Sequence, residues 1–407
     1  MFKKNVCIAL SALLLAGCVG CAGSASDSAS DGSELKTLSE IRSEAENISA
    51  LASKYDNLDL SDTLLYVPDV DELGGFTVDY TEPFEKKEQL LFDTAEWLTG
   101  EAPDESDITF FSRDYQTLPY AEYKDDPQRE YNYSISYETD SLRLIIEWRC
   151  NIVFIYKDYD NVPISDFGSY LWLDSLQDHP AAEYDLRAGE SAEEVFELQG
   201  GEISVADAVE LMKSELEASP FRIDGLELIP CRARVNKLGE KYAVSAMFLQ
   251  GYNGVLADYH DYLIDLETDE YDFFKDCISV ETTMARNGRI DQLHFTRIGT
   301  LTPTDDRFNE FISLERFLSM MSEKLTGRGR KFKVDSVELL YGLDTLYPEE
   351  YGPSSGKDLI DVFPLGIKSR PVWVAYFSQT GIHGAEQMCV SADAVTGELK
   401  LHESFVW

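Results

Sequence analysis

Two stretches of the sequence place apolar residues at the same intervals, and this repetition limits the folds open to the chain. "ISVADAVELMKSEL" from Ile203 aligns without a gap with "ISLERFLSMMSEKL" from Ile312, 109 positions later. Apolar residues recur every three or four positions, which is one face of an α-helix of about three turns. Ser204 and Ser313 are suited to cap the first free backbone amides. The spacing predicts two equivalent amphipathic helices, each needing an apolar surface to cover. Their buried faces are predicted to be Val205, Ala208, Val209, Met212 and Leu216, and Leu314, Phe317, Leu318, Met321 and Leu325.

The similarity continues after each helix. "FRIDGLELI" from Phe221 matches "FKVDSVELL" from Phe332, and "KYAVSAMF" and "RPVWVAYF" are typical of buried strands. "IDLETDEYDF" at 264–273 precedes "ADAVTGELKL" at 392–401 by 128 positions, and each predicts a strand, a turn and a strand. The chain is therefore predicted to be α+β, with tandem units of a helix packed on a small antiparallel sheet at 191–300 and 301–407.

The last turn carries a short signature. Asp393, Thr396, Gly397 and Glu398 resemble the D-x-x-T-G-E turn of the PepSY type of extracytoplasmic domain. The resemblance implies one helix across a small antiparallel sheet, and a role in restraining peptidases or accompanying membrane sensors. It transfers no catalytic residue. Gly397 suits a turn because glycine adopts positive φ without strain. The upstream copy departs from the signature at Asp269.

Residues 62–190 are predicted to form an N-terminal α+β domain. A helix is predicted from Pro83 to about Gly100, with Leu91, Ala95 and Leu98 on one side. Two alternating stretches, 131–137 and 142–150, predict a strand pair that turns at Thr139 and Asp140.

The first residues have the layout of an export signal: a positive start, a short apolar core and small residues. Leu15, Ala16, Gly17 and Cys18 resemble the lipobox of bacterial lipoproteins. The resemblance implies a signal peptide at 1–17, cut before Cys18, whose thiol takes a diacylglyceryl group. An ordinary secreted protein is the alternative.

Two further segments would join that anchor to the domains. Residues 18–34 predict a flexible tether, of which fifteen residues would reach about 20 Å. Residues 35–61 predict an amphipathic helix or stem, from the spacing of Leu35, Leu38, Ile41, Ala45, Ile48 and Leu51. These features predict a protein held by lipid at the extracytoplasmic face of the cell membrane.

The net charge of −40 argues against one class of partner. An acidic surface repels the phosphate backbone, whose affinity depends on cationic contacts, so nucleic acid is not expected as a partner. High solubility at an exposed surface explains the acidity more simply than a dedicated cation-binding role.

Sequence patterns that match catalytic motifs lack the neighbouring elements that these motifs need. "GPSSG" at 352–356 fits the nucleophile-elbow pattern but lacks the flanking strand and helix. The five histidines show no helical zinc spacing, so neither catalytic residue, metal nor cofactor is predicted. Cys150, Cys231, Cys277 and Cys389 are scattered, and both disulfides and free buried thiols stay open.

Three functions follow as hypotheses, in decreasing order. The first is a non-catalytic binding or regulatory module for an envelope partner, which predicts a continuous exposed apolar patch. The second is a glycan- or solute-binding lipoprotein, which predicts a pocket lined by convergent polar groups. The third is an acid-dependent hydrolase, which predicts a carboxylate pair with raised pKa in a cleft.

Overall fold

The computed structural model describes most of the chain from residue 35 onward. The described residues are 35–81, 85–111, 117–124, 134–147, 151–156, 180–257, 263–265, 271–272, 279–296, 298–328, 331–347, 365–377 and 387–404. Residues 35–407 form one compact unit. Among the described residues, no helix has both the length and the apolar character needed to span a membrane.

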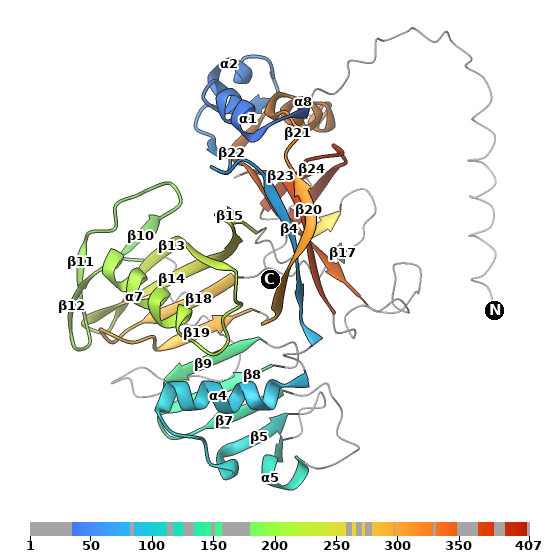
Figure 1. Ribbon diagram of the computed structural model, residues 1–407. Helices are drawn as coiled ribbons and strands as arrows, with labels where there is room; N and C mark the ends of the chain where they lie inside the picture. The colour runs from blue at the N-terminus through green and yellow to red at the C-terminus, as the bar shows by residue number, and fades with distance from the viewer. Residues whose placement is uncertain are drawn as a thin grey trace, which may run out of the picture. The chain divides into compact units, whose positions relative to one another are not determined.

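The predicted fold class, α+β with a helix packed on each small sheet, is wrong, because the described chain is mostly β and most of its strands belong to two large sheets (Figure 1). These sheets have 11 and 10 strands. The first sheet is antiparallel throughout its main path. In spatial order that path is β10 (Ala182–Asp185), β13 (Glu227–Leu238), β14 (Lys241–Tyr252), β18 (Ser279–Met284), β19 (Gln292–Phe295), β9 (Ile152–Tyr156), β8 (Leu142–Ile146), β7 (Ser134–Glu138), β5 (Ile108–Phe111) and β6 (Thr117–Pro119), with β15 (Val255–Leu256) beside β14.

The first sheet is large because β9 and β19 pair with each other. Leu293 lies opposite Phe154, and both side chains are buried. An apolar strand such as β9 cannot be left as an open sheet edge without exposing unpaired backbone groups and inviting association. Strands β5 to β10 of residues 62–190 and strands β13, β14, β15, β18 and β19 of residues 191–300 therefore share one sheet, and the boundary at 190 stays a prediction.

Two helices cover the same face of this sheet (Figure 1). α4 (Lys87–Thr99) contacts β7 and β8, whereas α7 (Val205–Glu217) contacts β13, β14 and β18. Their buried side chains belong to one hydrophobic cluster. The rings of Trp97 and Phe221 meet edge to face at 5.7 Å, and those of Phe221 and Phe295 lie 5.3 Å apart. A short helix α5 (Tyr120–Tyr123), the single turn η1 (Glu105–Asp107) and the hairpin of β11 (Val195–Leu198) and β12 (Gly201–Ser204) complete this part.

The second sheet runs β17 (Tyr271–Asp272), β16 (Leu263–Asp265), β25 (Leu399–Ser404), β24 (Gln387–Asp393), β23 (Gly366–Phe377), β22 (Phe332–Leu346) and β2 (Leu58–Asp59). Three more strands join it: β3 (Leu64–Tyr66) beside β22, β4 (Leu73–Asp79) beside β23, and β20 (Thr300–Phe308) beside β4. The described residues at both ends of the chain thus contribute strands to this sheet.

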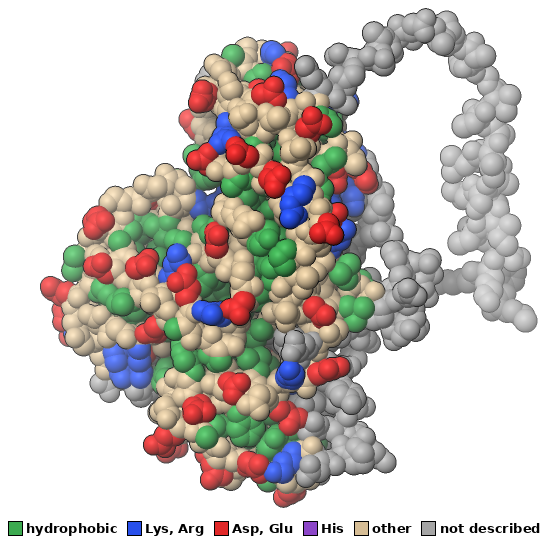
Figure 2. Space-filling model, in the orientation of Figure 1, with side chains coloured by type: hydrophobic (Ala, Val, Ile, Leu, Met, Phe, Trp, Pro, Cys, Tyr) green, Lys and Arg blue, Asp and Glu red, His purple; other side chains and the backbone are tan. Residues whose placement is uncertain are grey.

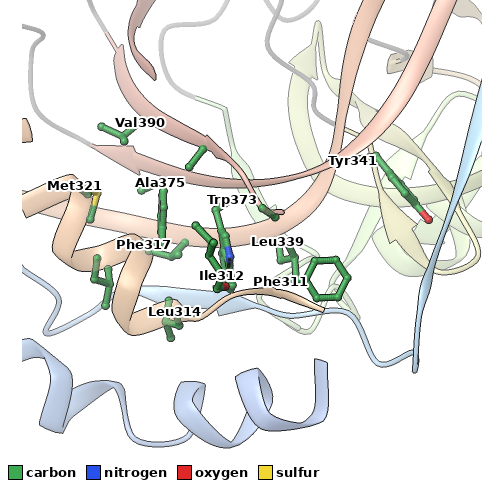
Figure 3. Packing of buried hydrophobic residues seen from close by; sticks show 14 of the residues in the cluster. Phe311, Ile312, Leu314, Phe317, Met321, Leu339, Tyr341, Trp373, Ala375 and Val390 are labelled. Carbon is green, nitrogen blue, oxygen red and sulfur yellow. Dashed lines mark hydrogen bonds between the residues drawn. The ribbon is translucent and has the colours of Figure 1, made fainter. Parts of the chain in front are cut away.

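Helix α8 (Leu314–Leu325) covers the second sheet (Figure 3). Phe317 stacks on Trp373 with ring centroids 5.7 Å apart, and the Trp373 Nε1 donates to the Ile312 carbonyl at 3.1 Å. Met321 lies over Ala375 and Val390 in the same cluster. The predicted helices, their buried faces and their caps are confirmed, since the hydroxyls of Ser204 and Ser313 accept from the amides of Asp207 and Arg316.

The segments that begin with α7 and α8 have the same order of elements. α7 precedes β13, β14, β18 and β19, and α8 precedes β22, β23, β24 and β25, each set pairing consecutively and antiparallel. Kinship of these segments with PepSY domains stays a prediction.

The predicted equivalence of 264–273 with 392–401 is wrong. Its first strand, β16, pairs with β17 and with β25, so it extends the second sheet instead of closing the first. The turn that occupies the place of 392–401 in the first segment is 285–291, between β18 and β19. It was not apparent from the sequence because the two turns differ in length and share few residue types.

The predicted helix of 35–61 is broken. It forms α1 (Leu38–Ala45) and α2 (Ile48–Ala52), separated at Asn47, whose side chain donates to the Ser43 carbonyl. Leu38 and Ile41 are buried in the cluster that contains α8, and β1 (Leu35–Lys36) pairs with β21 (Phe311–Ile312). The stem therefore packs on the C-terminal segment, and Arg42 also joins it to the residues that follow, through Asp69 and the Val70 carbonyl.

The predicted N-terminal elements are partly confirmed. α4 ends at Gly100, which caps it with a φ of 78°. β7 and β8 pair with Tyr137 opposite Leu144, but β8 ends at Ile146, and β9 begins at Ile152 and pairs with it. Pro83 lies outside the described residues.

Candidate functional site

A cavity of about 380 Å³ lies where α7 ends and β13 begins. Its volume is in the range of small-molecule sites. The cavity is lined by Glu217, Arg222, Ile223, Asp224, Gly225, Leu226, Glu227, Leu228, Gln250 and Phe295. We call this space the Gln250 cavity.

The unequal lengths of the strands explain why the helix and sheet separate here. β14 continues beyond the end of β18, so Leu249 has a partner in both β13 and β18, whereas Gln250 pairs with Leu228 of β13 and on its other side accepts only from the Ala257 amide, after the short strand β15. On the other side, α7 ends at Glu217, and the chain passes through Gly225 with a φ of 92° before β13 begins. The helix and one neighbouring strand therefore both stop short of Gln250.

Most of the cavity floor is apolar and buried. Ile223, Leu228 and Phe295 expose 3%, 8% and 1% of their surface. Gln250 is the exception, a side-chain amide that is 1% exposed. Its Nε2 has no hydrogen-bond partner among the atoms of the protein. A buried polar group left unsatisfied costs about 1–3 kcal/mol. A buried amide nitrogen that makes no hydrogen bond within the protein is a candidate for contact with a ligand.

Charged side chains surround the cavity mouth. The Arg222 Nε pairs with the Asp224 Oδ1 at 2.9 Å, and its Nη1 donates to the Glu217 carbonyl at 2.8 Å. Glu227 accepts from the Gly254 amide at 3.1 Å. The lining thus holds three carboxylates and one guanidinium, whose charge one carboxylate already balances.

The opposite face of the first sheet is polar but too closely packed to hold a ligand. Arg232, Arg234, Ser245, Thr283 and His294 line a cavity of only about 10 Å³, roughly the space of one water molecule. Burial lowers the pKa of His294, and the charge of Glu147 opposes this shift.

Two carboxyl groups with raised pKa lie near the β18–β19 turn. Burial is the main cause for both Glu215 and Asp291. Their hydrogen bonds explain them structurally: the Asp291 Oδ2 accepts from the amides of Ala285 and Arg286, and Glu215 accepts from the Ile290 amide. Neither lines the Gln250 cavity, so this pair gives the hydrolase hypothesis no support.

The signature turn is built as its sequence predicts. Gly397 has a φ of 79°, and the Asp393 Oδ1 accepts from the amides of Val395 and Thr396 at 2.9 and 2.7 Å. Arg370 bridges Asp393 and Asp344. Every one of these contacts lies within the protein, which gives the turn a structural role.

The remaining candidate residues divide between the described and undescribed parts of the chain. Cys231 and Cys389 are both buried, and burial raises the pKa of the Cys231 thiol to about 12. The predicted lipidation site Cys18, the "GPSSG" segment, Cys150 and Cys277 lie outside the described residues. Within the described ranges, no three histidine, cysteine or acidic residues gather as a metal site.

Gln250 was missed at the sequence level. Its signal was present, because "AVSAMFLQG" places one amide in a strand that is otherwise apolar or small. A single glutamine is ordinarily found at a surface or at a strand end.

Comparisons with known proteins add no function. No protein-family model and no curated protein matches the chain. One solved structure, an uncharacterized protein from Eubacterium rectale ATCC 33656, is similar over 85% of this chain and 90% of its own, with 14% identity and a TM-score of 0.48. At that level the similarity carries no conclusion.

Proposed function

We propose that this protein is a non-catalytic, solute-binding lipoprotein held at the extracytoplasmic face of the cell membrane, with its ligand in the Gln250 cavity. The observation that carries the proposal is the buried Gln250 amide without a partner, in the wall of a cavity large enough for a small molecule. The lipobox pattern that ends at Cys18 supports the location.

The geometry favours solute binding over the two other hypotheses. Large exposed apolar side chains are scattered over different elements of the described chain: Leu64 on β3, Val195 on β11, Leu211 on α7 and Val395 in a connection. Only Leu346 of β22 and Leu365 are neighbours among them, since the Leu365 amide donates to the Leu346 carbonyl. Acidic side chains are spread over the visible face and form no single patch (Figure 2). Single exposed apolar residues are ordinary on soluble proteins and mark no partner surface.

Solute binding is tested by a thermal-shift screen of small solutes on the full chain in detergent. A ligand that binds only the folded state raises the unfolding temperature. We expect stabilising compounds for the wild type and none for Leu226→Trp, which fills the cavity, while Leu226→Ala controls for loss of the leucine. Absence of any stabilising compound, or an equal response of Leu226→Trp, would overturn the proposal.

The anchor is tested separately by labelling with a radioactive fatty acid in a bacterial host. We expect label on the wild type and none on Cys18→Ser, with retention of Cys18→Ser in membranes reduced. Cys21→Ser is the matched control and should stay labelled. Label on Cys18→Ser would refute lipidation at this position without bearing on the cavity.

A further inference from the structure

We infer that the ligand of the Gln250 cavity is a small organic cation, with an apolar body and a carbonyl or hydroxyl oxygen. This inference rests on the proposed solute-binding function and specifies its chemical class. Three independent features of the lining lead to it: the polar atom of the wall, the apolar floor and the charge of the mouth.

The oxygen follows from the Gln250 amide. Its Nε2 is a hydrogen-bond donor without a partner in the protein, so the group that completes it must be an acceptor. A carbonyl or hydroxyl oxygen is such an acceptor.

The apolar body follows from the floor. Ile223, Leu228 and Phe295 are almost completely buried and present only hydrocarbon to the cavity. A fully hydrophilic solute would lose hydration there without compensation. A branched aliphatic group of about four carbons, by contrast, gains about 25 cal/mol for each Å² of its surface removed from water.

The positive charge follows from the mouth. Asp224 is neutralised by Arg222, and the carboxylates of Glu217 and Glu227 leave the mouth negative. The Lys213 Nζ lies 3.7 Å from the Glu217 Oε1. A pair of this kind near the surface reduces the negative charge of Glu217 only weakly. The protein as a whole carries −40. Both the local and the overall field therefore attract cations and repel anions.

Three probes with the same leucine side chain and carbonyl separate these features: L-leucinamide is a cation, N-acetyl-L-leucinamide is neutral, and N-acetyl-L-leucine is an anion. Binding to the full-length protein is measured by isothermal titration calorimetry. We expect leucinamide to bind at least tenfold more tightly than N-acetyl-leucine, with the neutral probe between them. Raised salt should narrow the difference.

Two variants assign the effect to named groups. Gln250→Leu should weaken leucinamide binding about tenfold and, because it removes an unsatisfied amide, raise the unfolding temperature of the free protein. Gln292→Leu, a buried glutamine on the opposite face of the same sheet, is the control and should leave binding unchanged. Glu217→Gln combined with Glu227→Gln should weaken the cation and spare the neutral probe.

The outcomes separate this inference from the proposed function. Equal binding of all three probes, or tighter binding of the anion, would overturn the cationic class and leave solute binding intact. The same holds if none of the probes binds while the solute screen yields compounds that Leu226→Trp no longer binds. Unchanged affinity in Gln250→Leu would remove the amide from the site.

Discussion

The segments that begin with α7 and α8 are built from the same order of elements, but they close their hydrophobic layers differently. Val244 of β14 lies opposite Met284, and in the corresponding place Trp373 of β23 lies opposite Ala392. Trp373 fills the second layer with an indole that stacks on Phe317. The first layer has the smaller, buried Val244 in this place and contains a cavity farther along β14, beside Gln250.

This difference shows how one arrangement can serve two purposes. The second segment is covered on the outer side of its helix by α1, and its core is filled with aromatic side chains. It is suited to hold the chain together next to the predicted tether. The first segment leaves one end of its layer open, where a ligand can replace the missing packing. Stability and binding would thus be divided between two similar scaffolds.

Removal of the indole should have the largest effect. Trp373→Ala is expected to lower the free energy of unfolding by about 3–5 kcal/mol, because it leaves a cavity and removes the hydrogen bond to Ile312. Val244→Ala, its counterpart, removes two carbon atoms and should cost about 1.6 kcal/mol. Urea unfolding with both variants measures the difference. Equal losses of unfolding free energy in the two variants would show that Val244 and Trp373 contribute equally to the stability of their segments.

The helices could be predicted because their information is local. Apolar spacing and a serine at the first position are both contained within a dozen residues, and α7 and α8 begin where these signals place them. The buried faces were predicted for the same reason.

The sheets could not be predicted in the same way. β9 and β19 are separated by more than a hundred residues, and neither strand contains a signal that names its partner. The hairpin β16–β17 looked like the end of the first repeat, yet it completes the second sheet beside β25. The Gln250 cavity depends on these pairings, because it exists only where β14 extends past β18.

The turn between β18 and β19 and the turn between β24 and β25 offer a second contrast. Asp291 is fully buried and accepts from two backbone amides and from the Arg289 Nε at 2.7 Å. Asp291→Asn would replace one carboxylate oxygen by an NH2 group, which would then face either the backbone amides or the Arg289 Nε, all of which are donors. It should therefore cost about 1.5–3 kcal/mol, the value of hydrogen bonds to a charged group. Asp393→Asn keeps one oxygen for both backbone amides and should cost about 0.2–1 kcal/mol in lost pairing with Arg370.

The acid dependence of stability should distinguish these aspartates. Burial alone would raise the pKa of Asp393, but hydrogen bonds from Thr396 and Val395 and the charge of Arg370 hold it below the usual 3.8. Its stabilisation is therefore complete above the unfolded pKa and is lost as the pH falls through the folded pKa. Asp393→Asn should therefore make the free energy of unfolding less dependent on pH in the acid range. The pKa of Asp291 is raised by burial, so its ionisation makes the free energy of unfolding fall as the pH rises, the opposite of Asp393. A smaller acid dependence of stability in Asp291→Asn would therefore contradict this assignment.

A glycine contact should sharpen the description of how β4 joins the second sheet. A Cβ at Gly366 would overlap the Val78 carbonyl oxygen, so Gly366→Ala must push β4 and β23 apart. Overpacking of this kind costs about 1–3 kcal/mol. Gly74→Ala, in the same strand β4 but with its nearest neighbour at 3.7 Å, is the matched control and should be nearly neutral in urea unfolding.

The helix caps should show small effects and the closest similarity between the two segments. The hydroxyls of Ser204 and Ser313 accept from the Asp207 and Arg316 amides at 3.1 and 3.0 Å. Substitution of either serine by alanine should lower the free energy of unfolding by about 1 kcal/mol. Ser204 also donates to the Asp207 carboxylate at 2.7 Å, so Ser204→Ala should cost slightly more. A Ser204→Ala, Asp207→Ala double variant isolates that contact. Losses that differ by more than this coupling would mean that the helices, like the layers beneath them, contribute unequally to the fold.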